Sequence, residues 1–353
     1  MFCSSSEPVS GTRYSHLRSL LRKRRCQSMR RTLVLGGTAW LGREIAQQLL
    51  AAGGDVTCLA RGDSGAVPSG VTFVRSDRRM LGAYDLVSSQ SWDEVIELSY
   101  DADLVIEALE TLAVTARHWT LVSSVSVYAD NKEAGADEDT ALVEPSDPGD
   151  YAHAKVAAER ATSEAVGDRL LVVRPGLIVG PGDSSDRFSY WVARLALASH
   201  EPVLVPDVTD RFVQFIDVRD LAEWLVSAGG RRLTGIYNAV GTERDLTTFL
   251  RTAVKVAGHT GELISTDDDW LLEHDVKYWA GPRSLPLWLP RSDTGFARRS
   301  RRRFHAAGGL ERSFEQTLED VLAEERTRGL DRARRSGLTR DEENLLLDEI
   351  TRR

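Results

Sequence analysis

The chain has 353 residues, of which 42% are hydrophobic and 28% charged, as expected for a globular protein with one large core or two joined domains. No uninterrupted apolar run approaches the length of a membrane span, so we expect a cytoplasmic protein that does not enter the membrane. Cys3, Cys26 and Cys58 show neither disulfide nor metal-ligand spacing.

Charge is distributed unevenly along the chain. Residues 1–31 carry eight Lys or Arg and one acid, which leaves 37 basic and 52 acidic side chains in the remainder. The acidic body repels polyanions, so a nucleic-acid partner is not expected.

Residues 1–28 are rich in Ser and basic residues and have no apolar periodicity, which predicts an unstructured extension. Three explanations are open: a transit peptide, a nucleic-acid arm, or a start upstream of the native Met29. We favour the last, because Met29 leads directly into the first predicted strand, and we expect the extension to be dispensable.

From Thr32 onward, short apolar runs alternate with helical periodicity. This pattern predicts an α/β fold with a doubly wound parallel sheet of the Rossmann type. The predicted strands are residues 33–35, 56–60, 71–74, 93–98, 120–127 and 170–174, and helices are predicted after residue 42, at 102–117 and around 151–155.

The second half of the chain predicts a smaller, discontinuous lobe. Residues 236–238 look like one more strand of the sheet, so the dinucleotide-binding domain is expected to comprise 29–175 and about 236–240. The substrate lobe would then comprise 176–235 and 241–353. Thr339 and Glu342 predict a capping box that starts a final helix.

A glycine-rich turn follows the first strand and opens a helix, the context of a dinucleotide-binding turn. Its predicted cofactor-binding residues are Gly36, Gly37, Thr38, Trp40, Leu41 and Gly42. Gly36 would permit the tight turn and Gly42 the close approach of helix and strand, with phosphate at the helix N-terminus. Ala39 stands where another glycine is usual. Arg43 and Glu44 exclude the rival lysine-containing phosphate loop.

The end of the second strand bears on the choice of nicotinamide cofactor. It reads Leu59-Ala60-Arg61-Gly62, without the acid that would bind a ribose 2′-hydroxyl. Arg61 therefore favours NADP(H) over NAD(H), the alternative being a solvated turn arginine. Asp77, after the third strand, is a weaker candidate for the adenine amino group.

Tyr151 and Lys155 lie four residues apart and should share one face of a helix. A lysine cation beside the phenol would lower the Tyr151 pKa and suit it to proton transfer. The alternative is two exposed residues on a helix. Ser124, near the end of the fifth strand, would complete a hydride-transfer site.

Five ordered motifs between residue 31 and about 240 resemble the extended or atypical short-chain dehydrogenase/reductase superfamily, in its NAD-dependent epimerase/dehydratase group. Besides the glycine turn, these motifs are residues 123–128 (SSVSVY), Tyr151 to Lys155 with Glu159, residues 174–183 (RPGLIVGPGD) and residues 215–222 (FIDVRDLA).

The resemblance implies a role for each matching residue. Ser124 would hydrogen-bond the substrate oxygen, with Ser123 and Ser126 as rivals, while Tyr151 passes the proton and Lys155 binds the nicotinamide ribose. The segment from Pro175 would lie along the nicotinamide.

The resemblance also implies substrate contacts near Ser126, Arg187, Gln214 and Asp217, and a homodimer through helices that flank the active site. Leu98 to Asp101 departs from the small residues and histidine often present in the family after the fourth strand.

Other features have plainer interpretations. The arginine run at 298–303 is expected to be a solvated face beside acidic segments, and Trp270, Trp279 and Trp288 either wall a substrate pocket or pack the lobe. No histidine spacing indicates a metal.

The sequence thus predicts an NADP(H)-dependent oxidoreductase or epimerase/dehydratase-type enzyme that acts on a carbonyl or alcohol of a small hydroxylated substrate. The alternative is a catalytically silent, dinucleotide-sensing or RNA-binding member of the same fold.

Overall fold

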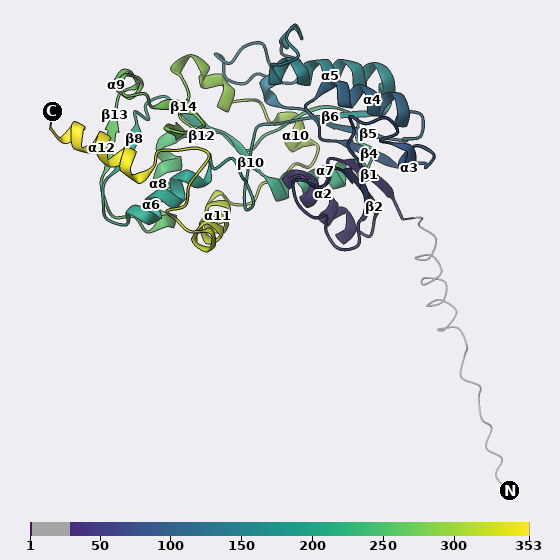
Figure 1. Cartoon of the computed structure of the whole chain (residues 1–353), viewed down its shortest axis with the longest axis horizontal. Coiled ribbons are helices and arrows are strands. Elements are labelled where there is room, and N and C mark those ends of the chain that lie inside the picture. The colour runs from purple at the N-terminus through teal and green to yellow at the C-terminus, as the bar shows by residue number, and fades with distance from the viewer. Residues whose placement is uncertain (2–28, 353) are drawn as a thin grey trace.

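Two units lie side by side along the long axis of the molecule, a layered sheet with helices and a smaller lobe that ends at the C-terminus (Figure 1). The computed structural model describes residue 1 and residues 29–352. The predicted extension therefore lies outside the described residues, apart from Met1.

The larger unit is built on a seven-stranded sheet in the order β11-β6-β5-β4-β1-β2-β3, with every neighbouring pair parallel. Its strands are β1 (Arg31–Leu35), β2 (Asp55–Ala60), β3 (Thr72–Arg75), β4 (Glu94–Glu97), β5 (Trp119–Val122), β6 (Leu170–Pro175) and β11 (Gly235–Ala239). The predicted doubly wound parallel sheet is confirmed. Its order reverses between β1 and β4, the place where such sheets open a crevice at the strand ends.

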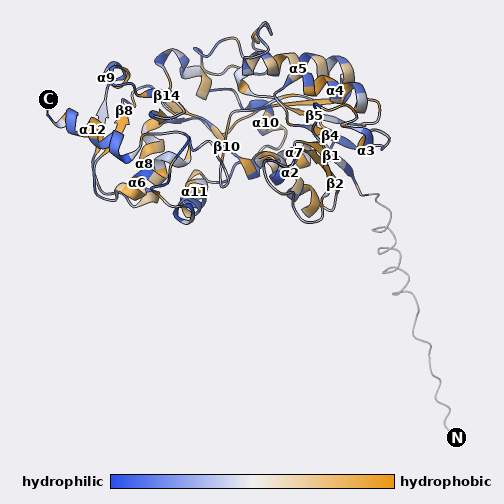
Figure 2. Cartoon of the chain, viewed as in Figure 1, coloured by the Kyte–Doolittle hydropathy of each residue, from blue (hydrophilic) through white to orange (hydrophobic). Residues whose placement is uncertain are grey.

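Helices cover both faces of the sheet, with α2 (Trp40–Ala51) and α7 (Val218–Gly230) on one side and α4 (Ala102–Leu112) and α5 (Tyr151–Val166) on the other. The short α3 (Asp85–Ser88) precedes β4. Successive strand residues point to opposite faces, so Leu33 and Leu35 pack in one cluster and Val34 in the other. The central strands are accordingly rich in hydrophobic residues (Figure 2).

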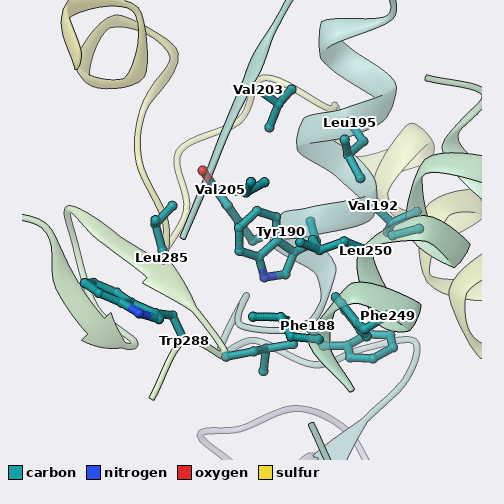
Figure 3. Packing of buried hydrophobic residues seen from close by; sticks show 14 of the residues in the cluster. Phe188, Tyr190, Val192, Leu195, Val203, Val205, Phe249, Leu250, Leu285 and Trp288 are labelled. Carbon is teal, nitrogen blue, oxygen red and sulfur yellow. The ribbon is translucent and has the colours of Figure 1, made fainter. Parts of the chain in front are cut away.

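The smaller lobe is mainly helical, with short paired strands. Its helices are α6 (Ser189–Ala198), α8 (Leu246–Ala257), α9 (Asp268–Glu273), α11 (Phe314–Arg328) and α12 (Arg340–Thr351). The short α10 (Arg302–Ala306) packs instead on β11 of the large sheet. Its strands are β7 (Leu177–Val179), β8 (Val203–Pro206), β9 (Phe212–Val213), β10 (Phe215–Asp217), β12 (Arg244–Asp245), β13 (Leu263–Thr266), β14 (Lys277–Trp279) and β15 (Ser284–Pro286). Aromatic residues such as Phe188, Phe249 and Trp288 join its elements into one core (Figure 3).

Several element boundaries differ from the sequence prediction. The strand predicted at 120–127 ends at Val122, because the Ser124 hydroxyl accepts the Ser126 N–H at 3.1 Å and starts a short 3₁₀ turn. The helix predicted at 102–117 ends at Leu112. Residues 218–230, which the prediction assigned to the substrate lobe, form α7 and cover the sheet, because the apolar face of α7 packs with the strands.

Two further local features and two absences can be stated for the described part of the chain. The capping box at Thr339 and Glu342 is confirmed. Cys58 is buried, and burial raises the pKa of its thiol to about 12. Within residues 29–352 no helix combines the length and apolarity of a membrane span, and no group of three His, Cys, Asp or Glu side chains could hold a metal.

Candidate cofactor and active-site cleft

The glycine turn between β1 and α2 depends on close backbone packing. Gly36 has a φ of +95°, which side chains rarely allow. A Cβ on Gly37 would overlap the Cys58 sulfur, and one on Gly42 would lie 2.5 Å from the Gly36 oxygen. The geometric roles expected of Gly36 and Gly42 are therefore confirmed.

The N-terminus of α2 has no side-chain cap. Its N-cap residue is Ala39, whereas α4, α5, α7 and α8 are each capped by an aspartate, namely Asp101, Asp150, Asp217 and Asp245. Uncapped N–H groups and the positive end of the helix dipole suit a phosphate. The turn therefore fits the pyrophosphate of a dinucleotide.

A cavity of about 360 Å³ lies beside the turn and extends over the ends of β2, β3 and β4. It is lined by Gly36, Thr38, Arg61, Asp77 and Leu98, among others. Arg61 is exposed and lies 3.4 Å from Asp63, and Asp77 accepts the Arg79 N–H at 3.1 Å. This end of the cleft has the shape and polarity to take an adenosine.

A second cavity, of about 560 Å³, holds the predicted catalytic residues together. Ser124, Tyr151 and Lys155 all line it, and Leu98 lines both cavities. The lining also includes Trp40, Leu41, Ser126 and Pro175. Trp40 joins the two sides, because its indole donates to the Pro181 oxygen at 2.8 Å.

Tyr151 stands at the start of α5, with 46% of its side chain exposed and its ring 5.8 Å from that of Tyr100. Burial of its hydroxyl end raises the Tyr151 pKa, while a hydrogen bond with Ser124 and the charge of Arg187 oppose the rise. The expectation that Lys155 lowers this pKa is wrong, because the Lys155 ammonium is turned toward backbone carbonyls.

Lys155 is almost fully buried, with 3% of its surface exposed. Its Nζ donates to the oxygens of Val122 at 2.6 Å and Ser99 at 2.9 Å. Burial lowers the Lys155 pKa to about 8, although the charges of Glu97 and Glu159 act in the opposite direction. The lysine therefore ties α5 to the ends of β4 and β5, at the wall of the cleft.

Three serines follow β5. The hydroxyls of Ser124 and Ser126 lie 3.1 Å apart and both line the cleft. Ser123 also lines the cleft but is more deeply buried, and its hydroxyl has no hydrogen-bond partner among the described residues. Ser124 therefore makes the local hydroxyl bonds typical of a strand end and also lies in the cleft.

The predicted substrate contacts separate in the structure. Arg187 lines the cleft, but Gln214 does not; its amide bonds to Gly241 and Arg299 beside another cavity. Asp217 is buried and caps α7, which removes it from the cleft. Asp183, the last residue of the 174–183 motif, lines the cleft. Phe296 lines it too, but sequence reasoning assigned Phe296 no role, because no local pattern links so distant a segment to the cleft.

The three tryptophans lie in different places, and the arginine run differs from its expected form. Trp279 lines the cleft, whereas Trp270 and Trp288 pack in the core of the lobe. The arginine run lies beside acids, as expected, but it is largely paired: Arg298 with Glu243, Arg301 with Glu311, Arg302 with Asp137, and Arg303 with Asp139.

Comparisons with known proteins agree with this architecture. The chain is 27% identical over 229 residues to the epimerase family protein SDR39U1 of Bos taurus and 26% identical over 230 residues to that of Homo sapiens; each match covers 60% of this chain and 74% of the relative.

Among solved structures, the UDP-glucose 4-epimerase of Thermus thermophilus in complex with NAD has a TM-score of 0.61 at 20% identity. That match covers 84% of this chain and 99% of the other. Epimerase Mth375 of Methanothermobacter thermautotrophicus has a TM-score of 0.63 at 15% identity, covering 87% and 95%. The model of the NAD dependent epimerase/dehydratase family matches residues 32–239, and the chain belongs to this family.

Proposed function

We propose that the protein is an NADP(H)-dependent oxidoreductase or epimerase/dehydratase-type enzyme that acts on a carbonyl or alcohol of a small hydroxylated substrate. One observation carries the proposal: Ser124, Tyr151 and Lys155 line a single cavity that shares Leu98 with the cavity beside the glycine turn. A dinucleotide that lies along the two cavities would bring its reactive end to these three side chains.

The chain's own residues would hold the dinucleotide at three points. The uncapped start of α2, after Gly36 and Gly37, would bind the pyrophosphate. Lys155 and the segment from Pro175 would border the nicotinamide end. When bound, the cofactor would supply the hydride transfer, and the protein would orient it and move a proton.

Tyr151 would be the acid and base of the reaction. Its raised pKa keeps the phenol protonated at neutral pH, so it suits proton donation to a carbonyl oxygen. Ser124, which contributes a hydrogen bond to Tyr151, would hold the same oxygen. Lys155 would hold the first turns of α5 in place and contact the cofactor ribose.

Arg61 supports the choice of NADP(H). Its side chain borders the cavity beside the glycine turn. Its one ion-pair partner among the described residues, Asp63, is 62% exposed. An exposed pair of this kind is weak, so a 2′-phosphate would compete readily for the guanidinium.

Replacing Tyr151 with Phe tests the proposal. Turnover of a carbonyl substrate, followed by NADPH absorbance, should fall at least about 100-fold because the proton donor is lost, while NADPH affinity should stay within about twofold. Tyr237→Phe, which removes a tyrosine hydroxyl outside both cavities, is the matched control and should keep its activity. Equal loss of turnover and cofactor binding, or RNA binding without dinucleotide binding, would contradict the proposal.

A further inference from the structure

Arg187 is a cation without a carboxylate partner in the described part of the protein. It lines the cavity of about 560 Å³ that also contains Ser124, Tyr151 and Lys155, which we call the inner cavity. No acid of residues 29–352 comes within ion-pair distance of its guanidinium. By contrast, Arg332 and Arg334 contact both Glu325 and Asp186, the residue that precedes Arg187. A charge in a cleft that has no ion-pair partner costs free energy, which a ligand of opposite charge would recover.

Two contacts hold the Arg187 side chain in place. Its Nε lies 3.2 Å from the Ser185 hydroxyl, and its guanidinium carbon lies 5.2 Å from the centre of the Trp279 ring. Its two terminal nitrogens have no hydrogen-bond or ion-pair partner among the described residues. A stacked guanidinium with open terminal N–H groups has the geometry that binds carboxylate or phosphate with two hydrogen bonds.

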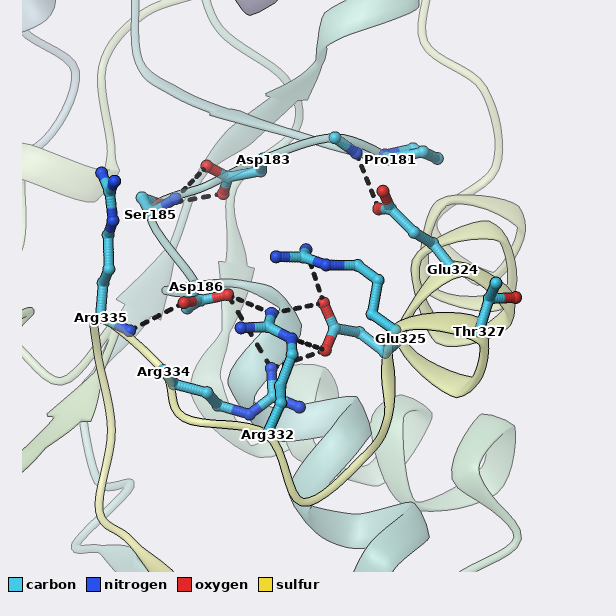
Figure 4. Close-up of polar contacts among 12 residues, drawn as sticks. Pro181, Asp183, Ser185, Asp186, Glu324, Glu325, Thr327, Arg332, Arg334 and Arg335 are labelled. Atoms are coloured by element: carbon cyan, nitrogen blue, oxygen red, sulfur yellow. Dashed lines mark hydrogen bonds and ion pairs between the residues drawn. The ribbon is translucent and has the colours of Figure 1, made fainter.

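The loop that carries Arg187 is fastened from behind. Asp186 accepts the Arg335 N–H at 2.8 Å and pairs with Arg332, while Glu324 accepts the Gly182 N–H at 2.7 Å (Figure 4). Both partner segments come from α11 and the chain that follows it. The guanidinium is therefore presented by a well-anchored loop, which lowers the entropic cost of binding a ligand.

Asp183 is the acid that faces Arg187, but its carboxylate oxygens are hydrogen-bonded to Ser185. Its carboxylate accepts both the N–H and the hydroxyl of Ser185, at 2.8 and 2.9 Å (Figure 4). Burial raises the Asp183 pKa, against the bonds from Ser185 and the charge of Arg187. Asp183 therefore orients Ser185, and Ser185 in turn orients Arg187.

We propose that Arg187 is the receptor for an anionic group on the substrate, so that the enzyme acts on a carboxylate- or phosphate-bearing carbonyl compound or alcohol rather than a neutral one. This inference rests on the proposed function, because it takes the inner cavity as the substrate site. The anionic group would lie against Trp279 and Arg187, and the reacting carbon would lie toward Tyr151 and Ser124.

Binding of three matched aromatic probes to the NADP⁺-saturated protein tests the inference. Benzoate, phenyl phosphate and neutral benzamide are titrated by calorimetry into wild type, Arg187→Gln and Arg187→Lys. At least one anion should bind wild type about tenfold or more tightly than benzamide, and whichever anion binds better identifies the carboxylate or the phosphate. Arg187→Gln should remove the preference and Arg187→Lys should keep only part of it, because lysine lacks the planar fork.

Arg160 lies on α5 and forms an exposed ion pair with Glu144. Arg160→Gln, which breaks that pair, is the control and should retain the preference for the anionic probe. Equal binding of neutral and charged probes to wild type, no saturable binding of either anion, or an unchanged preference in Arg187→Gln would overturn the inference. A tenfold loss of NADP⁺ affinity in Arg187→Gln would also overturn it, by assigning the arginine to the cofactor. If Arg187→Gln does not fold, the wild-type preference and Arg187→Lys decide.

Failure of the proposed function has a different signature. It appears as absent dinucleotide binding in wild type, or as undiminished turnover in Tyr151→Phe, whatever the probes show at Arg187.

Discussion

The ammonium of Lys155 donates a 2.6 Å hydrogen bond to the carbonyl oxygen of Val122, the last residue of β5. This bond joins the helix that carries Tyr151 to the strand that leads to Ser124. It also removes a charge from water, which explains why the Lys155 pKa falls to about 8.

Lys155 should make stability depend on pH in the alkaline range. An unfolded lysine keeps its proton up to about pH 10.4, whereas the folded protein releases it near pH 8. The unfolded state therefore binds more protons between these values, and the free energy of unfolding attributable to Lys155 should rise across the window by about 3 kcal/mol. Urea denaturation between pH 7 and 10.5 should show this rise in wild type relative to Lys155→Met.

The exposed Lys255 on α8 is the matched control, and Lys255→Met should follow the wild-type pH profile. Parallel profiles of wild type and Lys155→Met would show that burial does not perturb Lys155.

Gly42→Ala should damage both the fold and the cofactor site. The new Cβ would meet the Gly36 oxygen at 2.5 Å and the Gly37 Cα at 2.9 Å, so α2 must move away from the turn. We expect a loss of about 1–3 kcal/mol in unfolding free energy. We also expect weaker NADPH binding, measured by fluorescence titration, because the helix start no longer fits the pyrophosphate.

Gly230→Ala is the helical control. Its Cβ would meet only the flexible end of Arg30, at 3.4 Å, and Gly230 is the last residue of α7. The change should be neutral or should stabilise the protein by up to about 1 kcal/mol. Equal effects at the two positions would mean that close packing at Gly42 is unimportant.

Arg61→Ala should lower the affinity for NADPH and leave the affinity for NADH unchanged. Loss of a charge-assisted hydrogen bond to the 2′-phosphate is worth about 1.5–3 kcal/mol, which corresponds to a decrease of about 10-fold or more. Dissociation constants for both dinucleotides give the measurement. Arg117→Ala, at a similarly exposed arginine that pairs with Asp93, should change neither affinity. A parallel loss of both affinities in Arg61→Ala would argue against a phosphate contact.

Glu325→Gln should destabilise the smaller lobe. Glu325 is fully buried and pairs with Arg328 at 3.1 Å, Arg332 at 2.8 Å and Arg334 at 2.7 Å, so the change leaves three guanidinium groups short of negative charge (Figure 4). We expect a loss of about 3 kcal/mol or more in unfolding free energy by urea denaturation. Glu319→Gln, at an exposed position on the same helix, should change it by less than about 0.5 kcal/mol.

The sheet and the glycine turn were predictable because their signals are local. Apolar runs of strand length, with glycines at the turn, indicate β1 and α2 without knowledge of any distant residue. The error at Ser124 has a local cause too, since a serine hydroxyl competes with the sheet for backbone N–H groups and apolar spacing does not register that competition.

The electrostatics around Tyr151 and Lys155 were not predictable from spacing. Tyr151 and Lys155 share a helix, as four-residue spacing requires, but the direction of the lysine depends on carbonyls at the ends of β4 and β5. Residues 218–230 were similarly misassigned, because membership of a layer depends on which apolar faces meet in space.

The sequence by itself determined the parallel sheet, the glycine-rich turn and the helix with Tyr151, since periodicity and backbone freedom are properties of neighbouring residues. Only the tertiary structure decided that Arg187, Trp279 and Tyr151 line one cavity while Gln214 lies outside it. Those side chains come from separate segments, and burial and charge act through the space between them rather than along the chain.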